Sequence, residues 1–191
     1  MAKRTHHLYL WQTLTGAALV GATASFIQII ERIQYAEAPT RQLFCNLNSV
    51  FSCSNVFAAW QSSVFGFSNA IMCLAFFVTI FGAALAGLTG AQLSRNLRAW
   101  LQGLSVFFLL FGAWYLWQST YVIGALCIFC IFCYAAVILM NFAWLRLNAE
   151  DFPLKSGREG MRWLVARNAD VALWVIWTLT VAGWMLLRFA V

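Results

Sequence analysis

The stretch "LWQSTYVIGALCIFCIFCY", residues 116–134, lies within a run that carries no charged side chain from residue 99 to residue 145. A single helix of that length would measure about 70 Å at about 1.5 Å per residue, more than twice the roughly 30 Å core of a bilayer. The run must therefore fold back on itself. The polar residues "QST" at 118–120 predict the turn. Aromatic residues of the kind found at membrane interfaces flank it: Trp114, Trp117 and Tyr121.

The composition places the chain among integral membrane proteins. Of its 191 residues, 63% are hydrophobic and 9% are charged, whereas a soluble domain has roughly 25% charged residues. The formal net charge of +6 comes from basic residues scattered along the chain, so it predicts no nucleic-acid partner. In a membrane protein the distribution of these charges indicates orientation instead.

Three further apolar stretches are long enough to cross the lipid bilayer. They cover residues 8–30, 64–93 and 171–187. Together with the two halves of the folded-back run, they predict five transmembrane helices. We expect an all-α integral membrane fold without a sheet, because a helix satisfies its own backbone hydrogen bonds in lipid.

The expected organisation is a four-helix bundle with one appended helix. The bundle covers residues 1–146, and a hydrophilic cytoplasmic connector follows at 147–168. Pro153, Gly157 and Gly160 are expected to act as helix breakers in this connector. The fifth transmembrane helix then covers residues 169–191.

The basic residues are distributed unequally between the two sides of these helices. Nine fall on one side: Lys3, Arg4, Arg95, Arg98, Arg146, Lys155, Arg158, Arg162 and Arg167. Three fall on the other side: Arg32, Arg41 and Arg188. Because segments rich in Lys and Arg stay in the cytoplasm, the N-terminus and the 146–168 loop are predicted to be cytoplasmic. The loop from about residue 31 to residue 66 then faces outward.

The chain has six cysteines, and none lies in a predicted cytoplasmic loop. Cys45 and Cys53 belong to the outward loop, where disulfides form and persist. Cys127 and Cys130 form a Cys-x-x-Cys motif. With a helix that starts near Tyr121, Cys127 would lie roughly 9 Å below the outer surface, close enough to exchange with the loop thiols.

Several chemistries are compatible with these thiols. Zinc needs about four nitrogen or sulfur ligands, and both histidines lie near the cytoplasmic N-terminus, so we expect no metal site. Cys45 and Cys53 alone could form a structural staple, and Cys73 and Cys133 are interpreted as packing residues. One cysteine pair in the loop and another just under the same surface favour redox chemistry.

A redox-active dithiol in the membrane needs an electron acceptor. The chain has no paired intramembrane histidines for haem and no G-x-G-x-x-G fingerprint for a flavin or a nicotinamide. A membrane-dissolved two-electron carrier fits best, so we expect a quinone of the ubiquinone or menaquinone type as a diffusible co-substrate. A Cys-x-x-Cys near a helix start also gains from the positive end of the helix dipole.

Three segments of the chain form a specific combination. They are "CNLNSVFSC" at 45–53, "SNVFAAWQSSVFGFSNAI" at 54–71 and "YVIGALCIFC" at 121–130. In this order they resemble the vitamin K epoxide reductase family, in its bacterial, disulfide-forming branch. The resemblance covers about residues 10 to 146, and the fifth helix is similar to that of bacterial members with an additional span.

The resemblance implies catalytic roles for four cysteines. Cys45 and Cys53 would be the shuttle pair of the loop. Cys127 and Cys130 would be the active-site pair beside the quinone. It also implies that Asn69 and Tyr134 contact the quinone. By position alone, Asn69 could instead be a helix N-cap, and Tyr134 could be a packed aromatic residue with a polar tip.

Apolar residues recur at three- and four-residue spacing in the outward loop: Val50, Cys53, Phe57, Trp60 and Val64. This pattern predicts a short amphipathic half-helix that lies on the membrane and closes the site. A packed surface helix without a gating role is the alternative.

The sequence thus predicts a multi-pass oxidoreductase of the bacterial inner membrane whose active site faces the outer side. It would reoxidise a separate thioredoxin-like protein in the periplasm or another extracytoplasmic space. Electrons would pass through the two cysteine pairs to a membrane quinone, which supports disulfide bond formation. Two alternatives remain open: quinone-epoxide reduction as the main activity, and a non-catalytic membrane subunit whose loop disulfide is structural.

Overall fold

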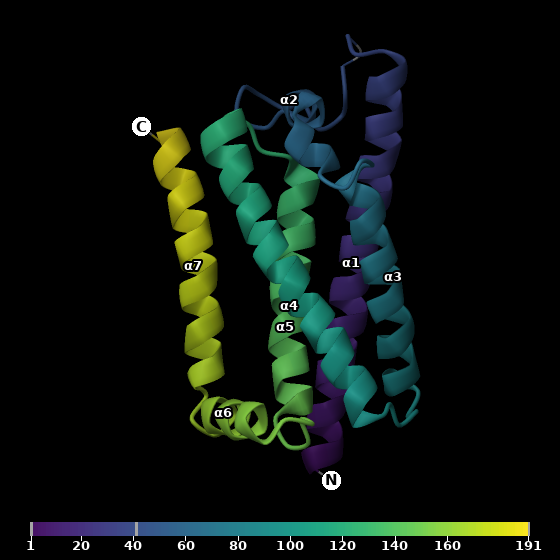
Figure 1. Ribbon diagram of the computed structural model, residues 1–191, viewed down its shortest axis with the longest axis vertical. Helices are drawn as coiled ribbons and strands as arrows, with labels where there is room; N and C mark the ends of the chain where they lie inside the picture. The colour runs from purple at the N-terminus through teal and green to yellow at the C-terminus, as the bar shows by residue number, and fades with distance from the viewer. Residues whose placement is uncertain (1, 41, 191) are drawn as a thin grey trace.

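A computed structural model of the chain describes residues 2–40 and 42–190. Five of its helices are long and apolar enough to cross a membrane (Figure 1). They are α1 (Ala2–Glu37), α3 (Asn69–Leu88), α4 (Arg95–Gln118), α5 (Ile128–Asn148) and α7 (Ala169–Ala190). The predicted all-α membrane fold is confirmed. Arg41, counted among the basic residues of the outward side, lies outside the described residues.

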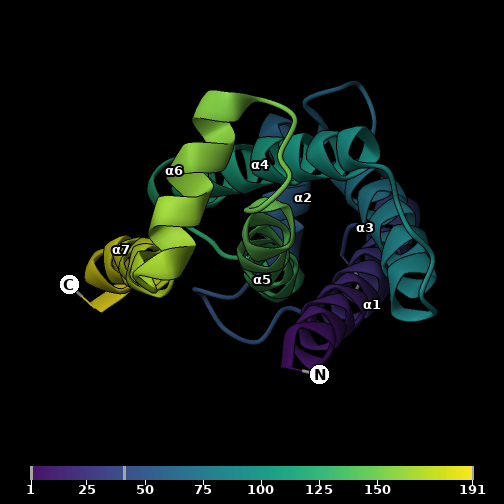
Figure 2. The same ribbon diagram turned by 90° about the horizontal axis from the view of Figure 1, so that it is seen from below.

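Four of these helices form a bundle, and the fifth lies at its edge. Helix α1 packs against α3 and α5, and α4 packs against α5. Figure 2 shows α7 outside this group of four. The core contains fully buried large side chains such as Phe77 and Trp144. Gly21 lets α1 approach α3 closely, because a Cβ atom at this position would come within 2.3 Å of the Phe77 ring.

The two ends of the bundle differ in what they carry (Figure 1). One end holds the described loop residues 38–40 and 42–52, the short helix α2 (Cys53–Ala58), the 3₁₀ helix η1 (Trp60–Ser63) and the turn between α4 and α5. The other end holds the N-terminus, the turn between α3 and α4, and helix α6 (Lys155–Ala166). This grouping agrees with the predicted separation of the basic segments, while the side that faces the cytoplasm stays a prediction.

The turn between α4 and α5 lies further along the chain than predicted. Instead of turning at 118–120, the chain continues as a π-helix, η2 (Ser119–Ile123), and reverses at Gly124. Gly124 has a φ of 73°, a left-handed conformation that favours glycine. Two of the three polar residues have partners that are compatible with a continuing helix. The Thr120 hydroxyl donates to the Leu116 carbonyl at 2.8 Å, and the Gln118 side-chain oxygen accepts from the Gln61 amide at 3.3 Å.

The hydrophilic connector also differs from the expectation. Gly157 and Gly160 lie inside α6 and do not interrupt it. Gly157 allows close packing against Phe152, whose ring would lie 3.0 Å from a Cβ atom at this position. The two helices that the connector joins are also in contact: Arg146 on α5 donates to the buried carboxylate of Asp170 on α7 at 2.5 Å. Helix α7 is therefore tied to the bundle by an ion pair.

The predicted half-helix exists, but it is split. It begins at Cys53 and ends at Ala58, and Ala59 is extended before η1 starts. Cys53 and Phe57 are buried as the apolar stripe predicts, whereas Trp60 lies past the break and is 68% exposed. One face of this segment covers the end of the bundle, and the remainder points away from it.

Candidate functional site

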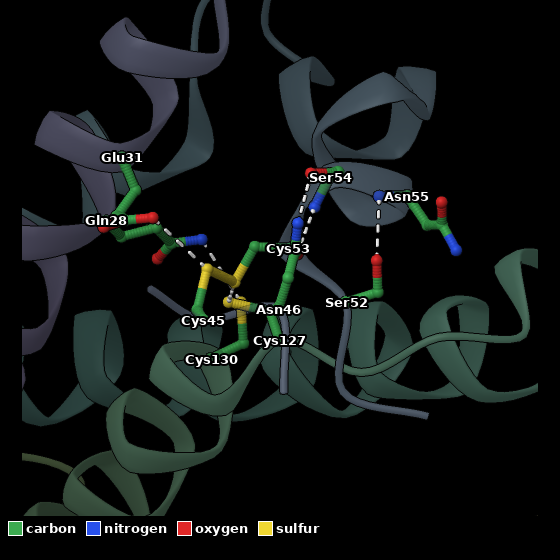
Figure 3. Close-up of a disulfide and its surroundings, with 10 residues drawn as sticks. All are labelled: Gln28, Glu31, Cys45, Asn46, Ser52, Cys53, Ser54, Asn55, Cys127 and Cys130. Atoms are coloured by element: carbon green, nitrogen blue, oxygen red, sulfur yellow. Dashed lines mark hydrogen bonds between the residues drawn. A yellow bond between two sulfur atoms is a disulfide. The ribbon is translucent and has the colours of Figure 1, made fainter. Parts of the chain in front are cut away.

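The loop pair forms a disulfide, Cys45–Cys53. Both residues are fully buried, with 0% of their surface exposed. Polar contacts hold the chain on either side of the bond: the Asn46 amide donates to the Ser54 hydroxyl at 2.7 Å, and the Ser54 backbone N–H donates back to Asn46 at 3.2 Å (Figure 3). The disulfide is therefore held in place at the covered end of the bundle.

A short parallel bridge of backbone brings the two cysteine pairs together. The Ser52 N–H donates to the Leu126 carbonyl at 3.1 Å, and the Leu126 N–H donates to the Val50 carbonyl at 2.7 Å. Cys53 and Cys127 are the next residues along the two bridged segments. Their sulfur atoms lie 3.6 Å apart, so the free thiol of Cys127 contacts the loop disulfide.

The Cys-x-x-Cys motif lies directly at a helix N-terminus. The helix was expected to start near Tyr121, but α5 begins at Ile128 with Cys127 as its N-cap. Cys127 therefore lies where the helix dipole favours a thiolate. A hydrogen bond from the Cys130 thiol lowers the pKa of Cys127, against the opposing effect of burial. Both thiols are free, so the loop pair is oxidised and the helix pair is reduced.

A mainly apolar cavity lies beside Cys130, inside the bundle. Its volume is about 60 Å³, which is room for about five water molecules. Aromatic rings form much of the wall: Phe57, Phe77, Phe108, Phe111, Tyr115 and Tyr134. Asn69 and Cys130 also line it. A small apolar pocket with a few convergent polar groups is typical of a ligand site.

Asn69 is not the N-cap of α3. Ser68 occupies that position, and Asn69 is the first residue of the helix. Its amide nitrogen donates to the Gln61 carbonyl at 2.7 Å, while its side-chain oxygen is buried without a hydrogen-bond partner. An unpaired buried acceptor is costly, and a quinol hydroxyl would satisfy it. The second hydrogen of the amide remains available to a hydrogen-bond acceptor in the cavity.

Tyr134 is held from two sides. Its ring occupies space that Gly112 leaves open, since a Cβ atom there would approach the ring within 2.6 Å. Its hydroxyl accepts a hydrogen bond from the Trp177 indole on α7 at 2.9 Å. The hydroxyl therefore keeps its own hydrogen for donation. Neither the packing partner nor the α7 contact was foreseen from the sequence.

Three polar residues near the end of α1 were missed by the sequence analysis. The Gln28 amide donates to the Cys130 sulfur at 3.3 Å, and the Glu31 carboxylate lies 3.6 Å from the Cys45 sulfur. Arg32 donates to the Phe57 carbonyl at 2.5 Å. Residues three and four positions apart share a helix face. The segment "QIIER" at 28–32 therefore contained a signal: a polar face on an otherwise apolar helix.

The two remaining cysteines also line the cavity. The Cys133 thiol lies 3.7 Å from the Gly21 carbonyl and 3.4 Å from the Ser25 hydroxyl, which suits a packed thiol with local partners. Cys73 is half-buried. Within residues 2–40 and 42–190, no three His, Cys, Asp or Glu side chains are grouped so as to hold a metal ion.

Comparison with known proteins identifies the family. No curated protein matches the chain. Residues 12–145 match the model of the vitamin K epoxide reductase family, which covers more than half of the 191 residues and includes both cysteine pairs. The resemblance seen in the sequence is thereby confirmed at the level of the family, and the multi-pass helices agree with it. The chain belongs to the vitamin K epoxide reductase family, whose members are quinone-linked thiol oxidoreductases or epoxide reductases.

Proposed function

We propose that this protein is a quinone-dependent thiol oxidoreductase that reoxidises a separate thioredoxin-like protein. One observation carries the proposal: the free Cys127 thiol lies 3.6 Å from the sulfur of Cys53, which is itself bonded to Cys45. Thiol–disulfide exchange needs a thiolate in contact with a disulfide sulfur and an accessible path. The contact between the pairs supports a relay between the loop and the membrane.

The relay would run through four thiols. A thiolate of the reduced partner attacks Cys45, the loop disulfide breaks, and Cys53 leaves as a thiolate. Cys53 then attacks Cys127 in the oxidised helix pair, forms a Cys53–Cys127 disulfide, and releases Cys130 as a thiolate. The second partner thiol resolves its mixed disulfide and frees Cys45, which attacks Cys53 and releases Cys127. Two electrons have then moved from the partner to the helix pair.

The cavity supports the final transfer. A quinone, of the ubiquinone or menaquinone type, supplies the two-electron acceptor when it is bound, and the Cys127–Cys130 disulfide re-forms. Cys130 lines the cavity, and the Gln28 amide at 3.3 Å stabilises its thiolate. Asn69 and Tyr134 each keep a hydrogen for an oxygen of the head group, where negative charge develops during reduction.

Orientation and organisation are part of the same proposal. The four-helix bundle at 1–146 would be the catalytic domain, with 147–168 as a cytoplasmic connector and the fifth helix at 169–191. The unequal distribution of basic residues supports a cytoplasmic N-terminus in a bacterial inner membrane. The relay would then face the periplasm or another extracytoplasmic space, where a secreted thiol protein meets it and disulfides persist.

Anaerobic mixing tests the function directly. The protein is mixed with a reduced thioredoxin-like protein and either ubiquinone or menaquinone, and quinol formation is followed by absorbance. We expect one quinol for each partner disulfide. A quinone epoxide replaces the quinone in a parallel reaction, and faster turnover there would make epoxide reduction the main activity. If neither acceptor supports turnover and the Cys45–Cys53 disulfide stays intact, the result would favour a non-catalytic protein whose disulfide is structural.

A further inference from the structure

Glu31 is a buried carboxylate with no ion-pair partner among the described residues. Its side chain lies near the end of α1, and only 7% of the residue is exposed. Among the described residues, the other buried acidic side chain is Asp170, and it forms an ion pair with Arg146. No ion pair is found for Glu31 in that part of the chain. Burying an unpaired charge is costly, so the position requires an explanation.

The neighbouring arginine does not supply the missing charge partner. The Arg32 guanidinium is used elsewhere: it donates to the Phe57 carbonyl at 2.5 Å and to the Ser62 and Ser63 hydroxyls at 2.7 and 3.1 Å. These contacts tie α2 and η1 to α1. The carboxylate of Glu31 instead points into the group of sulfur atoms (Figure 3).

The contact of Glu31 changes with the redox state of the loop pair. Its Oε2 lies 3.6 Å from the Cys45 sulfur, and a disulfide sulfur has no hydrogen to donate. When Cys45 is reduced, its S–H can donate to this oxygen. Since Cys45 is 0% exposed, bulk water cannot take its proton while the loop stays closed. Glu31 is the group in place to do so.

We propose that Glu31 is a catalytic residue, the general base that deprotonates Cys45 when the loop disulfide re-forms. The inference rests on the proposed relay and adds a proton acceptor to it. The Cys45 proton moves to Glu31, and the Cys45 thiolate attacks Cys53 in the Cys53–Cys127 disulfide. The Cys45–Cys53 bond forms, the Cys53–Cys127 bond breaks, and Cys127 leaves as a thiolate. Electrons balance within the exchange, and the proton stays on Glu31.

The charges that face Glu31 favour this timing. Cys45 and Cys53 face it from the loop and α2, Cys127 faces it from the start of α5, and Arg32 is its neighbour on α1. The hydrogen bond from Cys130 lowers the pKa of Cys127, and the charge of Glu31 acts in the opposite direction. Protonation of Glu31 removes that charge as Cys127 becomes the leaving thiolate.

A single-turnover experiment separates this step from the rest of the relay. Fully reduced protein is mixed anaerobically with one equivalent of quinone and no partner. Quinone absorbance reports oxidation of the helix pair, and acid quenching with peptide mapping reports the Cys53–Cys127 and Cys45–Cys53 bonds. In Glu31→Gln we expect unchanged quinone reduction, accumulation of Cys53–Cys127, and about hundredfold slower formation of Cys45–Cys53, within the range of general base catalysis.

The pH dependence distinguishes a base from a packing role. In Glu31→Gln the thiol must ionise without a neighbouring base, so the rate of loop closure rises with pH across the alkaline range in which thiols ionise. The ratio of wild-type to variant rate should therefore fall as pH rises through that range. A purely structural role gives a ratio that is independent of pH.

Two further variants complete the test. Glu37→Gln removes an exposed carboxylate from the same helix and should match the wild type, while Glu31→Asp keeps a shorter carboxylate and should recover part of the rate. Loop closure in Glu31→Gln at the wild-type rate, or a ratio that does not change with pH, overturns the role of Glu31 and leaves the relay standing. Absence of quinone reduction in the wild-type protein overturns the proposed function instead.

Discussion

The two cysteine pairs share one chemistry but lie in opposite surroundings. Cys45 and Cys53 are fully buried at the covered end of the bundle, and the Glu31 carboxylate lies 3.6 Å from the Cys45 sulfur. Cys127 and Cys130 begin a transmembrane helix, and Cys130 lines an apolar cavity. A neighbouring carboxylate suits a pair that must exchange protons, whereas an apolar cavity strengthens the few hydrogen bonds made to a reacting ligand.

This difference divides the work of the site between proton handling and electron delivery. The sulfur atoms of the two pairs approach each other at the 3.6 Å contact between Cys53 and Cys127. Changes near the loop should therefore alter disulfide exchange and leave quinone chemistry intact, and changes in the cavity should do the reverse.

The largest effect is expected where the two regions join. Cys130→Ala removes the cavity thiol that completes the helix disulfide, so quinone reduction should be lost. A Cys53–Cys127 disulfide should form when Cys127 attacks Cys53 and Cys45 leaves, because Cys130 is no longer present to release Cys127 and only the return of Cys45 can reverse the step. Non-reducing peptide mapping checks this, with Cys53→Ala/Cys130→Ala as the control that cannot form the bond. Recovery of Cys45–Cys53 alone from Cys130→Ala would favour a structural staple.

A cavity variant should show the second largest effect. Asn69→Ala removes a hydrogen-bond donor from the developing quinol oxygen, and we expect quinone reduction to slow at least about tenfold, or roughly 1.4 kcal/mol. Exchange between the partner and Cys45–Cys53 should stay close to the wild-type rate. Stopped-flow quinone absorbance measures the first rate, and trapping of the mixed disulfide measures the second. A loss of both rates would show that Asn69 acts by holding η1.

A smaller effect is expected from the fifth helix. Trp177→Phe removes the N–H that positions the Tyr134 hydroxyl and keeps an aromatic ring, so quinone reduction should slow by about threefold, or roughly 0.7 kcal/mol. Tyr134→Phe should have a similar effect.

Combining these changes tests whether they act through one hydrogen bond. In the Tyr134→Phe background, Trp177→Phe should have no further effect. Trp174→Phe is the matched control, because the Trp174 indole N–H has no hydrogen-bond partner among the described residues. Additive losses, or an equal loss in Trp174→Phe, would mean that the residues contribute only packing.

Much of the fold could be predicted because a bilayer restricts the choices. Apolar stretches of sufficient length predict helices, and all five appear in the structure. The turn between α4 and α5 could not be located from polarity, since Ser119 and Thr120 are buried and remain helical. Gly124 was the better signal, because a left-handed residue often ends a helix.

The site was only partly accessible to sequence reasoning. The spacing within "CIFC" and its place near a helix start indicated redox chemistry, and the resemblance implied the pairing with Cys45 and Cys53. The partners of these thiols come from elsewhere: Gln28 and Glu31 reach them across the bundle. Trp177 lies on a helix that had been interpreted as an appendage. Such contacts depend on the rotation of one helix against another, which apolar stretches do not encode.

The complete burial of the Cys45–Cys53 disulfide has a consequence for selectivity between reductants. Small thiols dissolved in the surrounding solution cannot touch either sulfur, since both residues are 0% exposed. A reductant must first displace the segment over the bond, which Arg32 holds through the Phe57 carbonyl. A protein partner gains binding energy from a large contact surface to offset that displacement, and a small thiol does not. In the proposed relay, the closed loop would insulate the quinone pool against wasteful reduction by low-molecular-weight thiols.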